Sequence, residues 1–337
     1  MTGSPTPVRQ EPTSQDWAAL ARSVDGELLL PGSEAFEWAR RPFIARFDAI
    51  KPRAVVRCAA PDDVVEALAF AGRFGLEIAA RSGGHDFAGR SSTLGVLLDL
   101  TPLDAVEVSG GTVKVGAGMR TGALCKLLYE RGLAIPMGTC PSVGISGLTL
   151  GGGLGILGRA HGLTCDRLLA VEAVLADGRT VACDAEHHSD LFWALRGAGA
   201  GSFGVVTAFT FEPLQAPEPT TSFHLVWPFA DAAAVISAWQ SWSPVGPDEL
   251  SADLELSAIG DPASEPTVEV FGAVLAGEAD AGSLLGELVA HVGSESRSID
   301  RPQLSYLGTC HFQAEPSVSY DLIEQTPLGE RRRTRLG

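Results

Sequence analysis

The sequence has no apolar run long enough to cross a membrane. Its 337 residues contain no stretch of about 18 or more apolar residues, the length that a membrane-spanning helix needs. Residues 1–15 are rich in proline, serine and threonine, and they lack the basic and then apolar segments of a secretory signal. These absences predict a cytoplasmic protein without a membrane partner.

Positive charge is also scarce. Lysine and arginine total 25 against 41 aspartates and glutamates, so the formal net charge is −16. This balance argues against nucleic acid as a partner, because binding to a phosphate backbone depends on clustered cations. A small molecule that carries phosphate would have to be held by main-chain N–H groups and single arginines at short range.

The cysteines lack the spacing of a metal site. They are Cys58, Cys125, Cys140, Cys165, Cys183 and Cys310. No pair has the Cys-x-x-Cys spacing and no histidine stands at metal-ligand spacing, so no metal is expected. In a cytoplasmic protein the thiols would be reduced, and Cys58 and Cys125 fall at positions expected in the core.

The spacing of apolar residues predicts a β-α-β unit early in the chain. Residues 53–58 are expected to form a strand, Pro61 to open a helix and Gly75 to end it. A second strand at 76–80 then leads into the loop 81–85. Loops at the exit of such a unit commonly bind ligands.

More elements are expected after this unit. Strands are expected at 95–100, 106–108, 113–115, 168–176, 179–182 and 205–211, and helices at 121–130 and 190–196. In the last of these helices, Phe192, Trp193 and Leu195 are expected to face the core.

A proline-rich stretch at 213–221 predicts a domain boundary. Beyond it we expect strands at 222–227, 250–258 and 267–275 and helices at 230–242 and 278–292. This order is typical of an antiparallel sheet with helices on one face, so the predicted fold class is α+β.

Two glycine-rich turns each carry one reactive side chain. Residues 81–85 read Arg-Ser-Gly-Gly-His, and residues 138–144 read Gly-Thr-Cys-Pro-Ser-Val-Gly. The second turn opens a run with eight glycines among residues 138–158. Glycines let the main chain approach a planar ring or a pyrophosphate closely, so the two turns together indicate a flavin site.

Residues 153–158 also match the Gly-x-Gly-x-x-Gly pattern of a nicotinamide-dinucleotide site. The context argues against that interpretation, because glycines interrupt the segment before residue 153, where a nicotinamide site would have a strand. The acid at the expected distance, Asp177, lies in a hairpin turn.

Residues 42–213 resemble the FAD-binding domain of the vanillyl-alcohol-oxidase superfamily, which has the PCMH-type fold, and most resemble the berberine-bridge-enzyme-like oxidases. Besides the two turns, the matching motifs are Leu-Gly-Gly-Gly-Leu-Gly at 150–155, Ala-Asp-Gly-Arg at 176–179, Asp-Leu-Phe-Trp-Ala-Leu-Arg-Gly at 190–197 and Gly-Ser-Phe-Gly-Val-Val-Thr at 201–207. The resemblance implies a lead-in segment at 1–41, an FAD-binding domain of two α/β subdomains at 42–213, and a partial substrate domain at 214–337.

The resemblance also implies that FAD is attached by two covalent bonds. His85 would be linked through a ring nitrogen to the flavin 8α-methyl carbon, and Cys140 through a thioether to flavin C6. Both residue types are good nucleophiles. From the residues alone, His85 also fits a hydrogen-bonded turn histidine, and Cys140 an unreactive buried thiol. The other residues that the resemblance assigns to the cofactor are Arg81, Ser82, Gly83, Gly84, Gly138, Ser142, Val143, Gly144, Gly147, Gly151, Gly152, Gly153, Gly155, Gly204, Val205 and Val206.

The implied activity is an FAD-dependent oxidase. A hydride would pass from an alcohol carbon, or from a C–H bond beside a heteroatom, to flavin N5, and O2 would then accept the electrons and give H2O2. In the family, a valine at the position of Val143 accompanies the use of oxygen. The expected substrate is a small molecule, either a sugar or a natural-product intermediate.

Two alternatives stay open. One is a flavin dehydrogenase with an acceptor other than oxygen. The other is a flavin-binding protein without activity, because the C-terminal segment that carries the family's catalytic base is not found and the chain is expected to be shortened there. Tyr306 and Tyr320 stand in no matching motif, so no catalytic base is assigned, and no oligomeric state is predicted.

Overall fold

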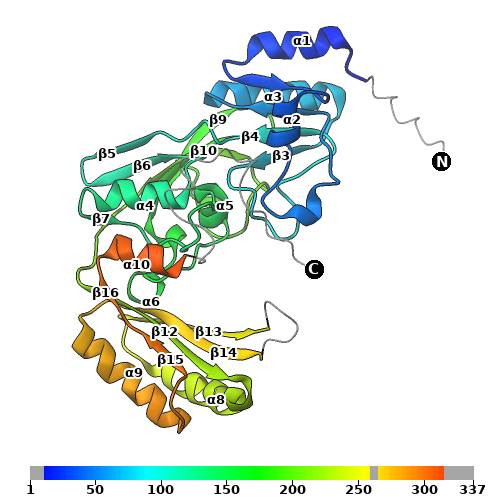
Figure 1. The fold of residues 1–337 in the computed structure, drawn as a ribbon. Coiled ribbons are helices and arrows are strands. Elements are labelled where there is room, and N and C mark those ends of the chain that lie inside the picture. Colours follow the sequence, from blue (N-terminus) through cyan, green and yellow to red (C-terminus); the bar gives the residue numbers. More distant parts are fainter. Residues whose placement is uncertain (1–10, 259–264, 315–337) are drawn as a thin grey trace, which may run out of the picture.

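The computed structural model describes residues 11–258 and 265–314. Its elements form three sheets of four or five strands with helices packed against them (Figure 1). The α+β fold class predicted from the sequence is therefore confirmed.

The first sheet contains the predicted β-α-β unit. Its strands lie in the order β1 (Glu27–Leu29), β2 (Ala54–Arg57), β4 (Val96–Asp99) and β3 (Ile78–Arg81). Strands β2, β4 and β3 are parallel, and β1 is antiparallel to β2. Helix α3 (Pro61–Phe74) joins β2 to β3, and it begins and ends where expected, with Pro61 in its first turn and Gly75 at φ +64° after its last.

Helices α1 (Ser14–Ser23) and α2 (Glu34–Ala39) precede β2. The buried carboxylate of Asp63 ties this N-terminal part to α3. It accepts hydrogen bonds from the main-chain N–H groups of Asp25, Gly26, Ala59 and Ala60 over 2.7–3.2 Å.

The second sheet is antiparallel. Its strands lie in the order β5 (Val106–Ser109), β6 (Thr112–Gly116), β10 (Val205–Phe211), β8 (Leu168–Val174) and β9 (Thr180–Asp184). The helices around it are α4 (Thr121–Tyr129), α5 (Ile145–Leu150), α6 (Gly158–His161) and α7 (Ser189–Leu195), and a two-stranded pair is formed by β7 (Leu133–Ala134) and β11 (Leu214–Gln215).

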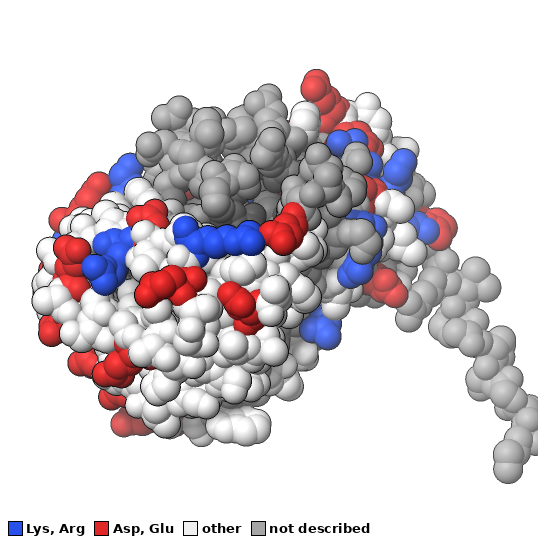
Figure 2. All heavy atoms as spheres, turned by 60° about the horizontal axis from the view of Figure 1, so that its bottom comes forward, with Lys and Arg blue, Asp and Glu red and all other residues white. Residues whose placement is uncertain are grey.

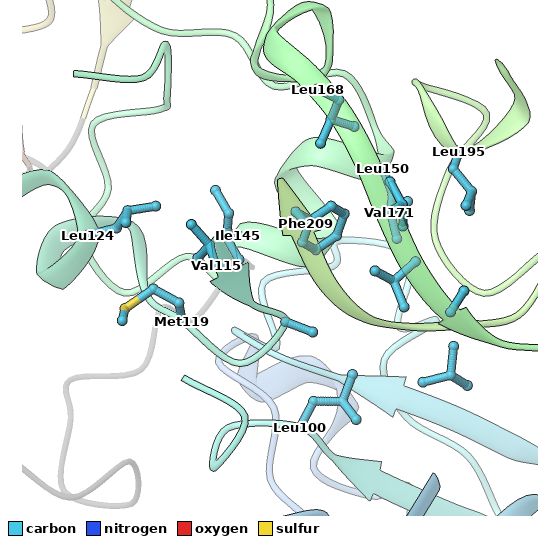
Figure 3. Close-up of a cluster of buried hydrophobic side chains, with 14 of the residues drawn as sticks. Leu100, Val115, Met119, Leu124, Ile145, Leu150, Leu168, Val171, Leu195 and Phe209 are labelled. Carbon is cyan, nitrogen blue, oxygen red and sulfur yellow. The ribbon is translucent and has the colours of Figure 1, made fainter. Parts of the chain in front are cut away.

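Side chains of the second sheet, of the first sheet and of the helices beside them form the main core. Phe209 on β10 is fully buried, and Figure 3 shows its ring with Ile145 to one side and Leu150 and Val171 to the other. On α7, Phe192 and Leu195 are buried as expected, but Trp193 is 78% exposed, so the expectation that it faces the core is wrong. Phe192 and Leu195 lie three residues apart on one helix face, and Trp193 is turned away from that face.

The third sheet is built after residue 219. Its strands lie in the order β13 (Leu250–Ser257), β14 (Thr267–Val274), β12 (Thr220–Pro228) and β15 (Ser298–Asp300), with β16 (Gln303–Leu304) also paired to β12. Helices α8 (Ala232–Trp242) and α9 (Glu278–Val292) cover one face, as predicted (Figure 1). Phe223, Leu225 and Trp227 of β12 point into a second core beneath these helices. Short 3-10 turns occur at η1 (Ala45–Phe47), η2 (Thr164–Arg167), η3 (Phe229–Asp231) and η4 (Ser243–Val245).

Helix α10 (Tyr306–Gln313) returns from the third sheet to the main core. Tyr306 and Cys310 belong to that core, and the Cys310 sulfur lies 3.5 Å from the sulfur of Cys125 on α4. The elements expected from the sequence end with the helix at 278–292, so this helix was not among them. The Arg-rich segment 331–335 lies outside the described residues, as does Tyr320.

Charged side chains of both signs are interspersed on the face that carries α8 and α9, with broad uncharged areas between them (Figure 2). Within residues 11–258 and 265–314, no helix is long and apolar enough to cross a membrane.

Replacing Phe209 with alanine should lower the free energy of unfolding by about 3–5 kcal/mol, because it removes a ring from the packed core. Trp193→Ala is the control, since it removes an aromatic ring from solvent and should change stability by no more than about 0.5 kcal/mol. Chemical denaturation measures both. Equal losses in the two variants would contradict this packing.

Candidate functional site

The two glycine-rich turns meet in the structure. His85 follows the end of β3, and its Nε2 lies 2.9 Å from the Ser142 hydroxyl. The sulfur of Cys140 lies 3.6 Å from the same hydroxyl. Two side chains that are 55 positions apart in the sequence therefore reach one oxygen atom.

The main chains of the turns are in direct contact. A Cβ added to Gly83 would overlap the nitrogen of Gly144, and a Cβ added to Gly144 would overlap Gly83 N and the Ser82 hydroxyl. Gly144 has an ordinary φ of −84°, so the requirement for glycine here is one of space.

The N-terminus of α4 holds the second turn in place. The main-chain N–H groups of Thr121 and Gly122 donate to Val143 O and Pro141 O, over 3.0 and 3.1 Å. The Thr121 hydroxyl donates to Cys140 O over 2.8 Å. The first N–H groups of a helix have no partner within the helix, so the turn supplies the acceptors that they need.

The first turn is held by the segment that follows α2. The ring of Phe43 stacks on the His85 imidazole with 3.8 Å between centroids and 15° between planes, and Phe43 N donates to Gly84 O over 3.1 Å. The imidazole is thus constrained on its face by Phe43 and at its edge by Ser142.

Arg81 joins three parts of the chain around the first turn. Its buried guanidinium donates to Ala39 O, Arg40 O and Ser91 O over 2.8–2.9 Å. These bonds fix the loop against the segment that carries Phe43.

A cavity opens beside the two turns. It is lined by residues of the segment 38–43, by Arg81, Ser82 and Gly83, and by Asp99, Thr101, Arg120 and Ser142. The Ser82 hydroxyl is buried there and has no hydrogen-bond partner among the described residues. Within the same part of the chain, the main-chain N–H groups of Gly83 and Gly84 donate to no acceptor. A buried hydroxyl and main-chain donors beside a glycine cradle suit a ligand that brings its own acceptors, as the ring and phosphates of FAD do.

Residues 52–184 match the family model described as FAD binding domain. The chain contains an FAD-binding domain. It is 37% identical over 198 residues to the uncharacterized FAD-linked oxidoreductase YvdP of Bacillus subtilis, an alignment that covers 58% of this chain and 44% of that protein.

Solved structures also resemble the chain. Physcomitrella patens BBE-like 1 superimposes with a TM-score of 0.84 at 28% identity, over 93% of this chain and 68% of that one. Glucooligosaccharide oxidase from Acremonium strictum, described with a 6-S-cysteinyl, 8α-N1-histidyl FAD, gives 0.79 at 28% identity, over 90% and 65%. The chain spans about half the length of the curated relatives that it matches. The suspected berberine-bridge-like relationship is confirmed.

Several glycines that the resemblance assigned to the cofactor also pack against the FAD-binding domain itself. A Cβ on Gly153 would overlap the Thr164 hydroxyl, and one on Gly155 would overlap Met137 O. A Cβ on Gly138 would touch Leu154 O, so segments 137–138 and 154–155 pack against each other. Helix α5, not a strand, precedes this run, which agrees with the ground on which the sequence argued against a nicotinamide site.

Of the residues assigned to the cofactor, Arg81, Ser82, Gly83 and Ser142 line the described cavity, and the others do not. Gly147 and Gly151 belong to α5 and its end, and Gly152 follows with φ +109°. Gly204 leads into β10, where Val205 and Val206 are buried in the main core.

The other described cysteines differ from Cys140 in their surroundings. Cys58 and Cys125 are buried in the core as expected. Burial raises the pKa of the Cys58 thiol far above its ordinary range, and it raises the pKa of Cys183 to about 11. Cys140 is only partly buried and lies beside the cavity wall, which leaves its sulfur more accessible than these thiols. No group of three potential metal ligands occurs in the part of the chain that the structure describes.

The sequence did not single out Phe43 or Arg120. Phe43 lies 42 residues before His85 in the sequence, and no local motif predicts a contact between them. Arg120 stands just before α4 and donates to Ser142 O over 2.6 Å, which links the helix start to the second turn.

Replacing Gly144 with alanine should destabilise the protein by about 1–3 kcal/mol, because the added methyl group enters occupied space. Gly72→Ala is the matched control. It lies on the exposed side of α3 with open space around it, and it should gain about 0.5–1 kcal/mol. Thermal or urea unfolding of flavin-free protein measures both. A Gly144→Ala variant as stable as the parent would show that the turns are not in contact.

Proposed function

We propose that the protein is an FAD-linked oxidase whose flavin is attached to both His85 and Cys140. The observation that carries this proposal is the convergence of the two side chains on the Ser142 hydroxyl at the wall of the cavity. The doubly linked flavin of glucooligosaccharide oxidase supports it by analogy, since that structure superimposes over 90% of this chain.

The residues around the cavity fit the parts of FAD. The N–H groups of Gly83 and Gly84 and the hydroxyl of Ser82 can donate hydrogen bonds to the cofactor, and the two glycines have no side chain that would fill its space. Arg41 lines the same cavity and can attract a phosphate at short range, although the whole chain carries a charge of −16. Phe43 and Ser142 hold the imidazole of His85 in one orientation.

When bound, the flavin supplies two-electron chemistry: it accepts a hydride from a C–H bond and passes the electrons to O2. The substrate class that we propose is an alcohol, or a compound with a C–H bond beside a heteroatom, taken from sugars or natural-product intermediates. Val143 directly precedes the loop contact at Gly144, and its short side chain leaves more room beside the turn than a leucine would. This space favours oxygen as the electron acceptor.

If both links form, the intact mass of the purified chain should increase by one FAD less the hydrogens lost in bonding, and yellow colour should stay with acid-precipitated protein. His85→Ala and Cys140→Ala should each keep one link, and the double variant should release its flavin on precipitation. Cys183→Ala should behave as the parent, since Cys183 lies in the core of the second sheet. A parent chain that releases all its flavin would overturn the attachment.

Replacing Val143 with leucine should slow the reoxidation of the photoreduced flavin by O2 about tenfold, which corresponds to about 1.4 kcal/mol in the barrier. Val143→Ala should react at least as fast as the parent. Stopped-flow absorbance measures the rate without knowledge of the substrate. A parent enzyme that reacts sluggishly with O2 would instead support a dehydrogenase.

A further inference from the structure

We propose that Ser142 is a positioning residue for flavin attachment, which selects Nδ1 of His85 as the linked nitrogen and holds the Cys140 sulfur beside it. This inference rests on the doubly attached flavin proposed above. It goes further by naming the side chain that determines which atom of His85 reacts.

Ser142 is itself held rigidly. The residue is 3% exposed, and its carbonyl oxygen accepts a hydrogen bond from Arg120 over 2.6 Å. Its neighbours Pro141 and Val143 are tied through their carbonyls to the first residues of α4. The hydroxyl therefore occupies a defined position between the two reactive side chains.

The hydrogen bond between Nε2 and the Ser142 hydroxyl can form in either tautomer of His85, and the tautomer in which Nε2–H donates is the one that can react at Nδ1. A neutral imidazole has one nitrogen with a proton and one with a lone pair, and a hydrogen bond at one nitrogen sets the state of the other. When Nε2–H donates to the Ser142 oxygen, the lone pair lies on Nδ1, which becomes the nucleophilic atom. The stack against Phe43 keeps the ring in the plane that presents this edge.

The same hydroxyl can serve Cys140. An oxygen that accepts from His85 Nε2 keeps its own proton, and the Cys140 sulfur lies 3.6 Å away as an acceptor. The contact fixes the rotamer of Cys140, so both nucleophiles are presented from one side of the crossed turns.

Each attachment is an oxidation and its atoms balance. A hydrogen on nitrogen or sulfur and a hydrogen on a flavin carbon are replaced by one N–C or S–C bond. The two electrons and two protons that are released reduce one O2 to H2O2. Ser142 is not consumed in either step.

The experiment compares reconstitution of flavin-free parent and Ser142→Ala protein with FAD in air. We expect the rate of covalent incorporation at His85, followed by intact mass, to fall about tenfold when the hydroxyl is removed. We also expect NMR of the isolated flavin peptide to show Nδ1 linkage in the parent and a mixture of Nδ1 and Nε2 linkage in the variant. Ser142→Thr keeps the hydroxyl and should restore the parent linkage.

Ser146→Ala is the control for a merely structural effect. Ser146 is also buried, and its hydroxyl donates to Ala117 O without touching either reactive side chain. This variant should lose thermal stability yet keep the parent rate and the parent linkage.

The outcomes separate the two proposals. A parent chain without any covalent FAD overturns the proposed attachment and this inference with it. A parent with both links and a Ser142→Ala variant with the same rate and the same Nδ1 linkage overturns only the role of Ser142. The same loss of rate and the same mixed linkage in Ser146→Ala would also overturn it.

Discussion

The crossing of two main-chain turns at Gly83 and Gly144 is the contact on which the site depends. Neither position has room for a Cβ, because each nitrogen lies where the other residue's side chain would begin. This approach brings the residues that follow and precede the glycines into one place. His85 and Cys140 both reach Ser142 because the main chains of the two turns approach each other this closely.

The surrounding elements keep the crossing in register. Strand β3 ends at Arg81, whose guanidinium binds three carbonyl oxygens and so ties the first turn to the segment near Phe43. Helix α4 satisfies its first N–H groups with carbonyls of the second turn. Ser82 and Gly83 place donors in the wall of the cavity, where they would act on an anion at contact distance despite the acidic net charge of the chain.

Local signals in the sequence were sufficient for most elements. Pro61 and Gly75 mark the ends of α3 because their main-chain preferences act within a single turn. Trp193 was expected in the core because it is apolar, but its angle around helix α7 turns it toward solvent. Helix α10 was missed because the residues that make it stable, among them Cys125, stand far away in the sequence.

The sequence by itself determined the kind of site. Histidine and cysteine in two glycine-rich turns, within motifs that resemble the FAD-binding domain of the berberine-bridge-like oxidases, indicate a flavin site. Only the tertiary structure decided the arrangement. Ser142 lies between His85 and Cys140, and Phe43 stacks on the imidazole. The guanidinium of Arg81 binds main-chain carbonyl oxygens. These contacts join segments from different sheets and helices, and their distances follow from packing, which no local pattern encodes.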